Sequence, residues 1–403
     1  MAKLLWGKVY FKEHFVGFLR EEPGERASFT YDDSYLSTAH PAIAHTLPLQ
    51  PEPHISQAGL HSYFDNLVAE GWLEEAQIRL LGKRQISRFE LLLAFGQDLA
   101  GAVSVIDPEP AALSDAMLEA EDTKEMAVFA GRASLSGIQP KLVAKEINGI
   151  LHPAKIGEVS THIVKFPSRH HDDLVVNEYL TTLAFKQLLP DDKVVELKIG
   201  EIKSFNEAVL IIKRFDRDEK GGRIHFEEFN QLLGYKSQSK YDGSYKQIAD
   251  FIYNTKTCLP TEAYRTYLRI LAGLILGNTD MHFKNFAMFH TPSGLRLTPS
   301  YDQVASAMYQ YKTLALTIWN TRDIKIGSLK PANIIKLGEE YNLKPAAIKM
   351  AADQLAKNIE AAKQIIADAK IGTPEIKDKL ITMIGKRWNG TFALIGKHLS
   401  AKR

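Results

Sequence analysis

Cysteine is almost absent from this sequence: Cys258 is the only one among 403 residues. A single cysteine excludes an intrachain disulfide and a cysteine-rich zinc site, and it favours a reducing compartment. Long hydrophobic runs are missing too, because the longest candidate, residues 271–276, is far short of the roughly 18–20 residues that span a bilayer. The N-terminal stretch MAKLLWGKVYFKEHF interrupts its apolar residues with charges and contains no signal-peptide core. We therefore expect a cytoplasmic protein with no membrane partner.

The sequence also has no excess of charge of one sign. Lys and Arg total 50 against 48 Asp and Glu, which gives a formal net charge of +2 at pH 7. A charge this close to neutral offers no general argument for binding to nucleic acid or to a membrane surface. The composition is that of a globular protein, and the length predicts two or three packed units.

The N-terminal part of the chain has the pattern of a small mixed domain. Residues 3–20 alternate apolar and polar positions around a polar turn, which predicts a β-hairpin. Residues 59–96 follow with helical spacing, and Ser87 with Glu90 can form a capping box there. We therefore predict a small mixed unit of strands and helices over residues 1–108.

The rest of the chain changes from strands to helices. Residues 109–216 contain several short β-like runs, and an Asn-Gly pair at 148–149 between two of them is a strong hairpin signal. A predicted helix at 174–189 interrupts these runs after the third one, as in the N-lobe of kinase-like folds. Residues 217–403 are mostly helical, with apolar residues spaced about 3.6 positions apart.

The side chains of residues 277–302 suggest phosphoryl transfer. Asp280 is followed by Asn285, and Asp302 comes after a predicted hairpin. This order supplies a carboxylate that orients the attacking hydroxyl and then two oxygen ligands for Mg²⁺. Each residue alone could be a turn or a cap, so the placement after a helix C-terminus is the more specific feature. His282, in the same loop, could face phosphate or simply hold the loop in place.

Two further segments could bind the nucleotide that such a site needs. In SLSGIQPK, residues 134–141, the small side chains would let the backbone approach phosphate oxygens, and Lys141 adds a cation. A Ser-rich structural turn is the simpler interpretation of this segment alone. Lys165, in HIVKFP, would need an anion if its strand is buried, and Glu178 in the next helix is its expected protein partner. An exposed strand lysine fits the pattern equally well.

Seven segments together resemble the HipA family of toxin serine/threonine kinases. In the family's order they are SLSGIQPKL (134–142), THIVKFP (161–167), NEYLTTLAFK (177–186), IIKRFDR (211–217), HFEEFNQLLG (225–234), GNTDMHFKNFAMF (277–289) and LTPSYDQVAS (297–306). The stretch VYFKEHFVGFLRE resembles the small domain that precedes the kinase core in full-length members. The resemblance implies an α+β, bilobal, protein-kinase-like fold. Its parts would be a β-rich N-terminal subdomain (1–108), an N-lobe with a phosphate loop (109–216) and a mainly helical C-lobe (217–403).

The resemblance also assigns roles to individual residues. It implies that Asp280 is the catalytic base, that Asn285 and Asp302 hold Mg²⁺, and that Lys165 contacts the phosphates of ATP. The other residues expected near the nucleotide are Ser136, Gly137, Ile138, Gln139, Pro140, Lys141, Lys213, Arg214, Phe215, His282, Phe283, Lys284 and Tyr301. Lys213–Phe215 corresponds to the hinge that meets adenine. Most members have Glu where Lys213 stands, but backbone hydrogen bonds to adenine do not depend on that side chain.

Members of the family also phosphorylate a serine in the loop that matches residues 134–141, which ejects the loop and silences the kinase. Ser134 occupies the position that is usually modified, and Ser136 is a second acceptor. A phosphate adds about −1.5 to −2 charges, which would repel the phosphates of ATP. The resemblance therefore implies an enzyme that limits its own activity.

The function implied by the resemblance is that of an ATP- and Mg²⁺-dependent serine/threonine kinase acting as the toxin of a toxin–antitoxin module. Its expected substrate is an aminoacyl-tRNA synthetase, with glutamyl-tRNA synthetase as the first candidate. Its expected partner is a small helix-turn-helix (HipB-like) antitoxin, through which any DNA contact would be mostly indirect. Two alternatives remain: a small-molecule kinase with the same apparatus, and a non-catalytic co-repressor that acts with a DNA-binding antitoxin.

Overall fold

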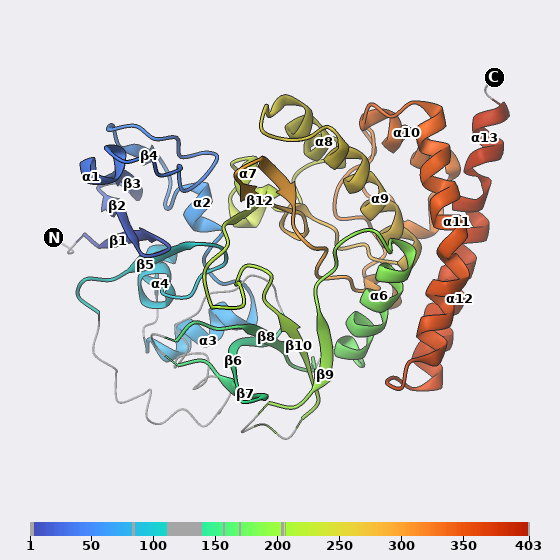
Figure 1. Ribbon diagram of the computed structural model, residues 1–403, viewed down its shortest axis with the longest axis horizontal. Helices are drawn as coiled ribbons and strands as arrows, with labels where there is room; N and C mark the ends of the chain where they lie inside the picture. The colour runs from blue at the N-terminus through green and yellow to red at the C-terminus, as the bar shows by residue number, and fades with distance from the viewer. Residues whose placement is uncertain are drawn as a thin grey trace. The chain divides into compact units, whose positions relative to one another are not determined.

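The computed structural model, shown as a ribbon in Figure 1, describes residues 4–82, 85–110, 139–155, 158–168, 171–202, 205 and 207–401. Two compact units are formed by contacts within the chain. Unit 1 comprises Met1–Pro167 and Leu197–Ser239, and unit 2 comprises Ser168–Glu196 and Lys240–Arg403. The chain therefore passes from one unit to the other three times.

The first half of unit 1 is built on a five-stranded antiparallel sheet in the order β4-β3-β2-β1-β5. Its strands are β1 (Trp6–Phe11), β2 (His14–Glu22), β3 (Arg26–Tyr31), β4 (His54–Ser56) and β5 (Val103–Ile106). The hairpin predicted within residues 3–20 is confirmed as β1–β2. Alternate side chains of the strands are buried in one core, as a sheet with one covered face requires; they include Val9, Leu19 and Phe29.

Short helices complete this half of unit 1. They are α1 (Asp33–Leu36), α2 (Ser62–Asp65), α3 (Trp72–Leu80) and α4 (Arg88–Phe95). Both hydrogen bonds of the capping box predicted from Ser87 and Glu90 are present at the start of α4. Helix α4 then buries Leu92 and Phe95 completely in the core of the sheet.

The second half of unit 1 is another five-stranded antiparallel sheet, in the order β7-β6-β8-β10-β9. Its strands are β6 (Lys141–Ile147), β7 (Ile150–Pro153), β8 (His162–Lys165), β9 (Leu197–Gly200) and β10 (Val209–Lys213). Asn148 and Gly149 form the predicted turn between β6 and β7, with φ angles of 52° and 79°. Two successive positive φ angles are what a two-residue hairpin turn needs, so the register of this edge follows from local sequence. The short elements β11 (Phe226–Glu228) and α7 (Phe229–Leu232) also belong to unit 1.

Unit 2 is mainly helical. Its helices are α6 (Leu174–Leu188), α8 (Tyr245–Asn254), α9 (Thr261–Leu276), α10 (Pro331–Glu340), α11 (Pro345–Asp368), α12 (Pro374–Gly390) and α13 (Ile395–Ala401). The antiparallel hairpin β12 (Ala287–Thr291) and β13 (Gly294–Leu297) lies between α9 and α10 in the chain. Together with the two sheets of unit 1, this confirms the α+β fold class.

The long helix α11 forms much of the core of unit 2. Its buried side chains Ile348, Leu355, Ile359 and Ile366 follow one another at intervals of seven, four and seven positions, which places them on one face of the helix. This face packs against α6 and α12, and Figure 1 shows α11 and α12 running side by side. None of the described helices is long and apolar enough to cross a bilayer.

Candidate active site

The predicted catalytic loop begins where α9 ends. Gly277 has a φ of 83° and ends the helix in the left-handed conformation, which favours glycine. The next residue, Asn278, is buried, and its side chain connects two parts of the site. Its amide oxygen accepts the backbone N–H of Asp280 at 3.0 Å, and its amide nitrogen donates to the backbone carbonyl of Asp302 at 3.3 Å. Asn278 therefore holds the two predicted acidic residues in one place, although sequence reasoning did not single it out.

Asp280 combines an accessible carboxylate with a desolvated setting. The side chain is exposed, and the hydroxyl of Tyr241 donates to its Oδ1 at 3.0 Å. The surrounding chain nevertheless displaces much of the nearby water, and this desolvation raises the pKa of Asp280 to about 6. The Tyr241 hydrogen bond and the charge of Lys240 act in the opposite direction, while the charge of Asp302 adds to the rise in pKa. An exposed carboxylate with a pKa near neutrality suits a general base.

Asn285 and Asp302 are brought together, as the sequence predicts for two metal ligands. The short 3₁₀ turn Phe283–Asn285 presents Asn285, whose amide nitrogen lies 3.5 Å from Oδ2 of Asp302. Asp302 has a φ of 52°, a left-handed conformation that aspartate tolerates better than most residues. The amide oxygen of Asn285 accepts the backbone N–H of His282 at 3.3 Å and keeps a second lone pair, so an amide oxygen and a carboxylate are both available as oxygen ligands. Such a donor set fits Mg²⁺.

Buried neighbours on both sides hold the catalytic loop. Met281 fills the space beside Gly273. If residue 273 carried a Cβ atom, that atom would lie only 2.3 Å from the sulfur of Met281. Phe283 fills the space beside Gly243 in the same way, with an added Cβ 2.5 Å from its ring. The hydroxyl of Tyr301 donates to the carbonyl of Lys284 at 2.7 Å. The side chains of Phe283 and Lys284 are buried, and His282 is buried beside the ring of Tyr241.

In unit 1, the two predicted phosphate-binding lysines lie next to each other. Lys141 of β6 and Lys165 of β8 are direct cross-strand partners, so their side chains leave the same face of the sheet. They are only 5% and 6% exposed, which is unusual for lysine. Gln139 donates to the carbonyl of Phe166 at 2.8 Å, and the N–H of Phe166 donates to the carbonyl of Pro140 at 2.9 Å. Two neighbouring buried ammonium groups suit a polyanionic ligand such as the phosphates of a nucleotide.

The predicted hinge residues differ in their surroundings. Lys213 is exposed at the end of β10. The ring of Phe215 packs on Phe226, with 5.0 Å between the ring centroids. The guanidinium of Arg214 is buried in an ion cluster, and its backbone N–H donates to the carbonyl of Thr161 at 2.9 Å. A contact from Arg214 to adenine would therefore have to use its backbone carbonyl.

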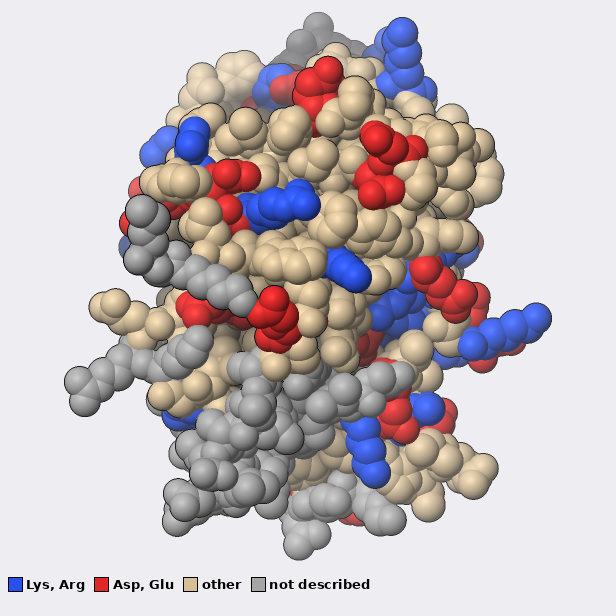
Figure 2. Space-filling view, turned by 90° about the vertical axis from the view of Figure 1, so that its left-hand side faces the viewer, with Lys and Arg blue, Asp and Glu red and all other residues tan. Residues whose placement is uncertain are grey.

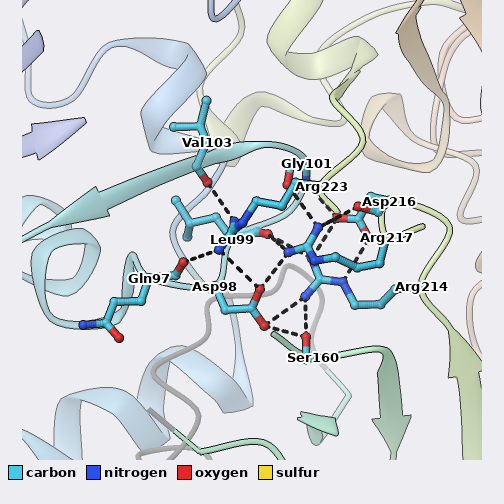
Figure 3. Close-up of polar contacts among 10 residues, drawn as sticks. All are labelled: Gln97, Asp98, Leu99, Gly101, Val103, Ser160, Arg214, Asp216, Arg217 and Arg223. Carbon is cyan, nitrogen blue, oxygen red and sulfur yellow. Dashed lines mark hydrogen bonds and ion pairs between the residues drawn. The ribbon is translucent and has the colours of Figure 1, made fainter. Parts of the chain in front are cut away.

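The ion cluster around Arg214 was not predicted from the sequence (Figure 3). Arg214 and Arg217 both contact two carboxylates, those of Asp98 and Asp216, at distances of 2.7–3.2 Å. Arg223 lies farther away, 3.8 Å from Asp98. Burial alone would raise the pKa of Asp98, but the charges of Arg214 and Arg217 outweigh it and hold the pKa below its usual value. The cluster therefore stays ionised inside unit 1.

Four predicted site residues lie outside the described part of the chain. They are Ser134, Ser136, Gly137 and Ile138. Glu178, the predicted partner of Lys165, is buried in α6 of unit 2.

Comparison with known proteins identifies the family. Residues 133–365 match the HipA-like C-terminal domain, and residues 7–106 match the HipA N-terminal domain. The chain belongs to the HipA family. The serine/threonine-protein kinase toxin HipA of Shewanella oneidensis is 29% identical over 345 residues, which is 77% of this chain and 77% of that protein. The structure of the S. oneidensis HipA, HipB and operator DNA complex contains a chain that matches the fold with a TM-score of 0.73. That match has 22% identity and covers 97% of this chain and 99% of that chain.

Family membership confirms two expectations from the sequence. The kinase-like fold is the HipA fold, with a β-rich N-terminal sheet and a helical C-terminal part. The protein is a HipA-like serine/threonine kinase of the toxin type, an activity that uses ATP. The predicted catalytic loop and the buried lysine pair both lie within the part that matches the HipA-like C-terminal domain.

Proposed function

We propose that this HipA-family kinase transfers the γ-phosphoryl group of ATP to a serine or threonine of an aminoacyl-tRNA synthetase and so arrests growth. Glutamyl-tRNA synthetase is the first candidate. The observation that best supports this reaction is the pair of hydrogen bonds from the Asn278 side chain to the backbones of Asp280 and Asp302, which holds the two residues near each other. An accessible base next to a pair of oxygen ligands is what phosphoryl transfer requires of a protein.

The chain's own residues divide the work of this reaction. Asp280 accepts the proton of the substrate hydroxyl as its oxygen attacks the γ-phosphorus, and the bond to the β,γ-bridging oxygen breaks to release ADP. Lys141 and Lys165 provide positive charge for the phosphates. Asn285 and Asp302 would hold Mg²⁺, which supplies charge neutralisation when bound. Because both ligands come from segments that Asn278 and the 3₁₀ turn hold in place, little reorganisation is needed at the reacting centre.

We also propose that phosphorylation of Ser134 or Ser136 limits the activity. The segment that carries both serines continues into Gln139 and Pro140, which are bound to Phe166 at the end of β8. A phosphate of about −1.5 to −2 charges close to Lys141 would compete with ATP for the same cations.

A helix-turn-helix antitoxin is the partner that we propose for this protein. The S. oneidensis complex, which contains HipA, HipB and operator DNA, supports it. On the face shown in Figure 2, Lys and Arg side chains are interspersed with Asp and Glu, and no continuous basic surface is visible among the described residues drawn there. The charges on that face therefore give no argument for direct DNA contact there, and we propose that DNA contact is made through the antitoxin.

Incubation of the kinase with labelled ATP, Mg²⁺ and a cell lysate tests the proposal. We expect one predominantly labelled protein, identified by mass spectrometry as an aminoacyl-tRNA synthetase, and phosphate on Ser134 or Ser136 of the kinase. The Asp280→Asn variant is the control and should label both proteins at least about a hundredfold more slowly. Label that appears in a small molecule and in no protein would contradict the proposed reaction. If the intact mass of the incubated kinase showed no added phosphate, the proposed regulation through Ser134 or Ser136 would be wrong.

Replacement of Lys165 by methionine tests the role of the buried lysine pair. Methionine keeps the apolar stem but removes the charge, so we expect KM for ATP to rise roughly 10- to 100-fold, the effect of losing a hydrogen bond to a charged group. Lys198, an exposed lysine in β9 of the same sheet, is the matched control, and Lys198→Met should leave KM unchanged. Steady-state kinetics with varied ATP measures both. If the folded Lys165→Met enzyme kept the wild-type KM for ATP, Lys165 would not be an ATP-binding residue.

A further inference from the structure

Tyr241 makes a contact that neither the sequence nor the proposed reaction accounts for. Its side chain is 46% exposed, yet its hydroxyl donates to Oδ1 of Asp280 at 3.0 Å. The two residues are 39 positions apart in the chain. An exposed tyrosine loses side-chain freedom when it holds such a position, so the contact needs support from its surroundings.

The turn that carries Tyr241 is joined to the catalytic loop by backbone contacts. The N–H of Phe283 donates to the carbonyl of Lys240 at 3.3 Å, and the N–H of Gly243 donates to the carbonyl of Tyr241 at 3.0 Å. The N–H of Thr317 donates to the carbonyl of Gly243 at 3.0 Å and ties the turn to a third segment. The Phe283 ring fills the space beside Gly243. The backbone at Tyr241 is therefore held on both sides of the residue.

The ring of Tyr241 is held as well. It meets the buried ring of His282 edge to face, with 4.9 Å between centroids and an interplanar angle of 84°. The ammonium group of Lys240 lies 5.5 Å from the centroid of the Tyr241 ring. An edge-to-face pair of this kind adds about 0.5–1.5 kcal/mol beyond area burial. These contacts hold the Tyr241 hydroxyl toward Asp280 although the Tyr241 side chain is exposed.

We propose that Tyr241 is a positioning residue for phosphoryl transfer: its hydroxyl holds Oδ1 of Asp280 and leaves Oδ2 to accept the hydroxyl of the protein substrate. The inference rests on the proposed role of Asp280 as the base. A general base must lie within hydrogen-bond reach of the proton it takes, and a carboxylate that turns freely spends little time in that orientation. A donor on one oxygen stops this rotation. It also favours the ionised form, which is the only form that can accept a proton.

The other groups that face Asp280 do not duplicate this contact. Lys240 and Asp302 act on Asp280 through charge, in opposite directions. The fully buried Tyr245 interacts with Asp280 through charge as well, and its hydroxyl has no hydrogen-bond partner among the residues that the structure describes. Among the described residues, the carboxylate of Asp280 thus has one hydrogen-bond donor, the hydroxyl of Tyr241, and a Tyr241→Phe substitution removes it.

The Tyr241→Phe variant tests the proposal, because phenylalanine keeps the ring contact with His282 and removes only the hydroxyl. We expect kcat for a protein substrate to fall about 10-fold or more, as for the loss of one hydrogen bond to a charged group. KM for ATP should stay the same. The acid limb of the kcat–pH profile should move to higher pH, because Asp280 without its donor binds a proton more readily. Tyr311→Phe is the matched control: Tyr311 is 50% exposed in the same unit, and its variant should keep the wild-type kcat.

Measurement of Asp280→Asn under the same conditions separates a failure of the role of Tyr241 from a failure of the proposed function. A Tyr241→Phe enzyme with wild-type kcat and pH profile, beside an inactive Asp280→Asn enzyme, would overturn the role of Tyr241 alone. A change confined to KM for the protein substrate would also overturn it, since Tyr241 would then bind substrate rather than orient the base. An active Asp280→Asn enzyme would overturn the proposed function and the role of Tyr241 with it.

Discussion

Replacement of Asp280 by asparagine is expected to lower kcat for phosphate transfer by about two to four orders of magnitude, the usual contribution of a general base. Asparagine has nearly the same shape and can still accept the hydrogen bond from Tyr241, so the loop should keep its structure. It cannot take the proton of the attacking hydroxyl. In the wild-type enzyme the same step should fail in acid: desolvation raises the pKa of Asp280 to about 6, so kcat should decline as the pH falls below that value.

Transfer of labelled phosphate to the protein substrate, measured between pH 5 and 8, tests this prediction. Asp250 provides the control, because it is an exposed carboxylate of α8 in the same unit that pairs with Lys246. Asp250→Asn should keep the wild-type rate and pH profile. If Asp280→Asn retained more than a tenth of the wild-type kcat, Asp280 would not be the base.

The second large effect is expected on stability, at the buried ion cluster of unit 1. Asp98 is 3% exposed and its carboxylate contacts both Arg214 and Arg217. Asp98→Ala leaves three arginines facing the single carboxylate of Asp216. Removal of one partner from a buried ion pair costs about 3–5 kcal/mol, because the remaining charges are left uncompensated. The free energy of unfolding should fall by that amount in chemical denaturation.

A dependence on pH should accompany this loss of stability. The arginines hold the pKa of Asp98 below its usual value, so its contribution to stability is complete above about pH 4 and declines as the pH falls through the lowered pKa. The Asp98→Ala variant should lack that part of the acid dependence. Glu75 is the control in the same unit, since its exposed pair with Arg79 should contribute less than about 1 kcal/mol. A loss of under 1 kcal/mol in Asp98→Ala would show that the cluster is not needed for stability.

The buried ion cluster also connects the two regions of the chain that match the HipA domain families. Asp98 belongs to the region that matches the HipA N-terminal domain, and Arg214 and Arg217 belong to the one that matches the HipA-like C-terminal domain. All three lie in unit 1. Buried ion pairs thus join the N-terminal region to the region of the lysine-bearing sheet within one compact unit.

Features that depend on neighbouring residues were determined by the sequence itself. The capping box of Ser87 and Glu90, the Asn148-Gly149 turn and the helix end at Gly277 all formed where they were predicted. Each is an interaction within about four residues, so local chemistry is enough to specify it. The order of Asp280, Asn285 and Asp302 is visible in the sequence as well, because the loop and its hairpin are continuous in the chain; the roles of the three residues stay a prediction.

The tertiary structure alone decided which distant residues support that site. Asn278 contacts the carbonyl of Asp302 across 24 positions, Tyr241 contacts Asp280 across 39, and Asp98 contacts Arg217 across 119. Nothing in the local pattern of a single Asn, Tyr or Asp states which residue it will meet, because that depends on how separate segments pack. The sequence determined which residues are available for this chemistry, and the packing determined which distant side chains surround the predicted base, Asp280, and the lysine-bearing sheet.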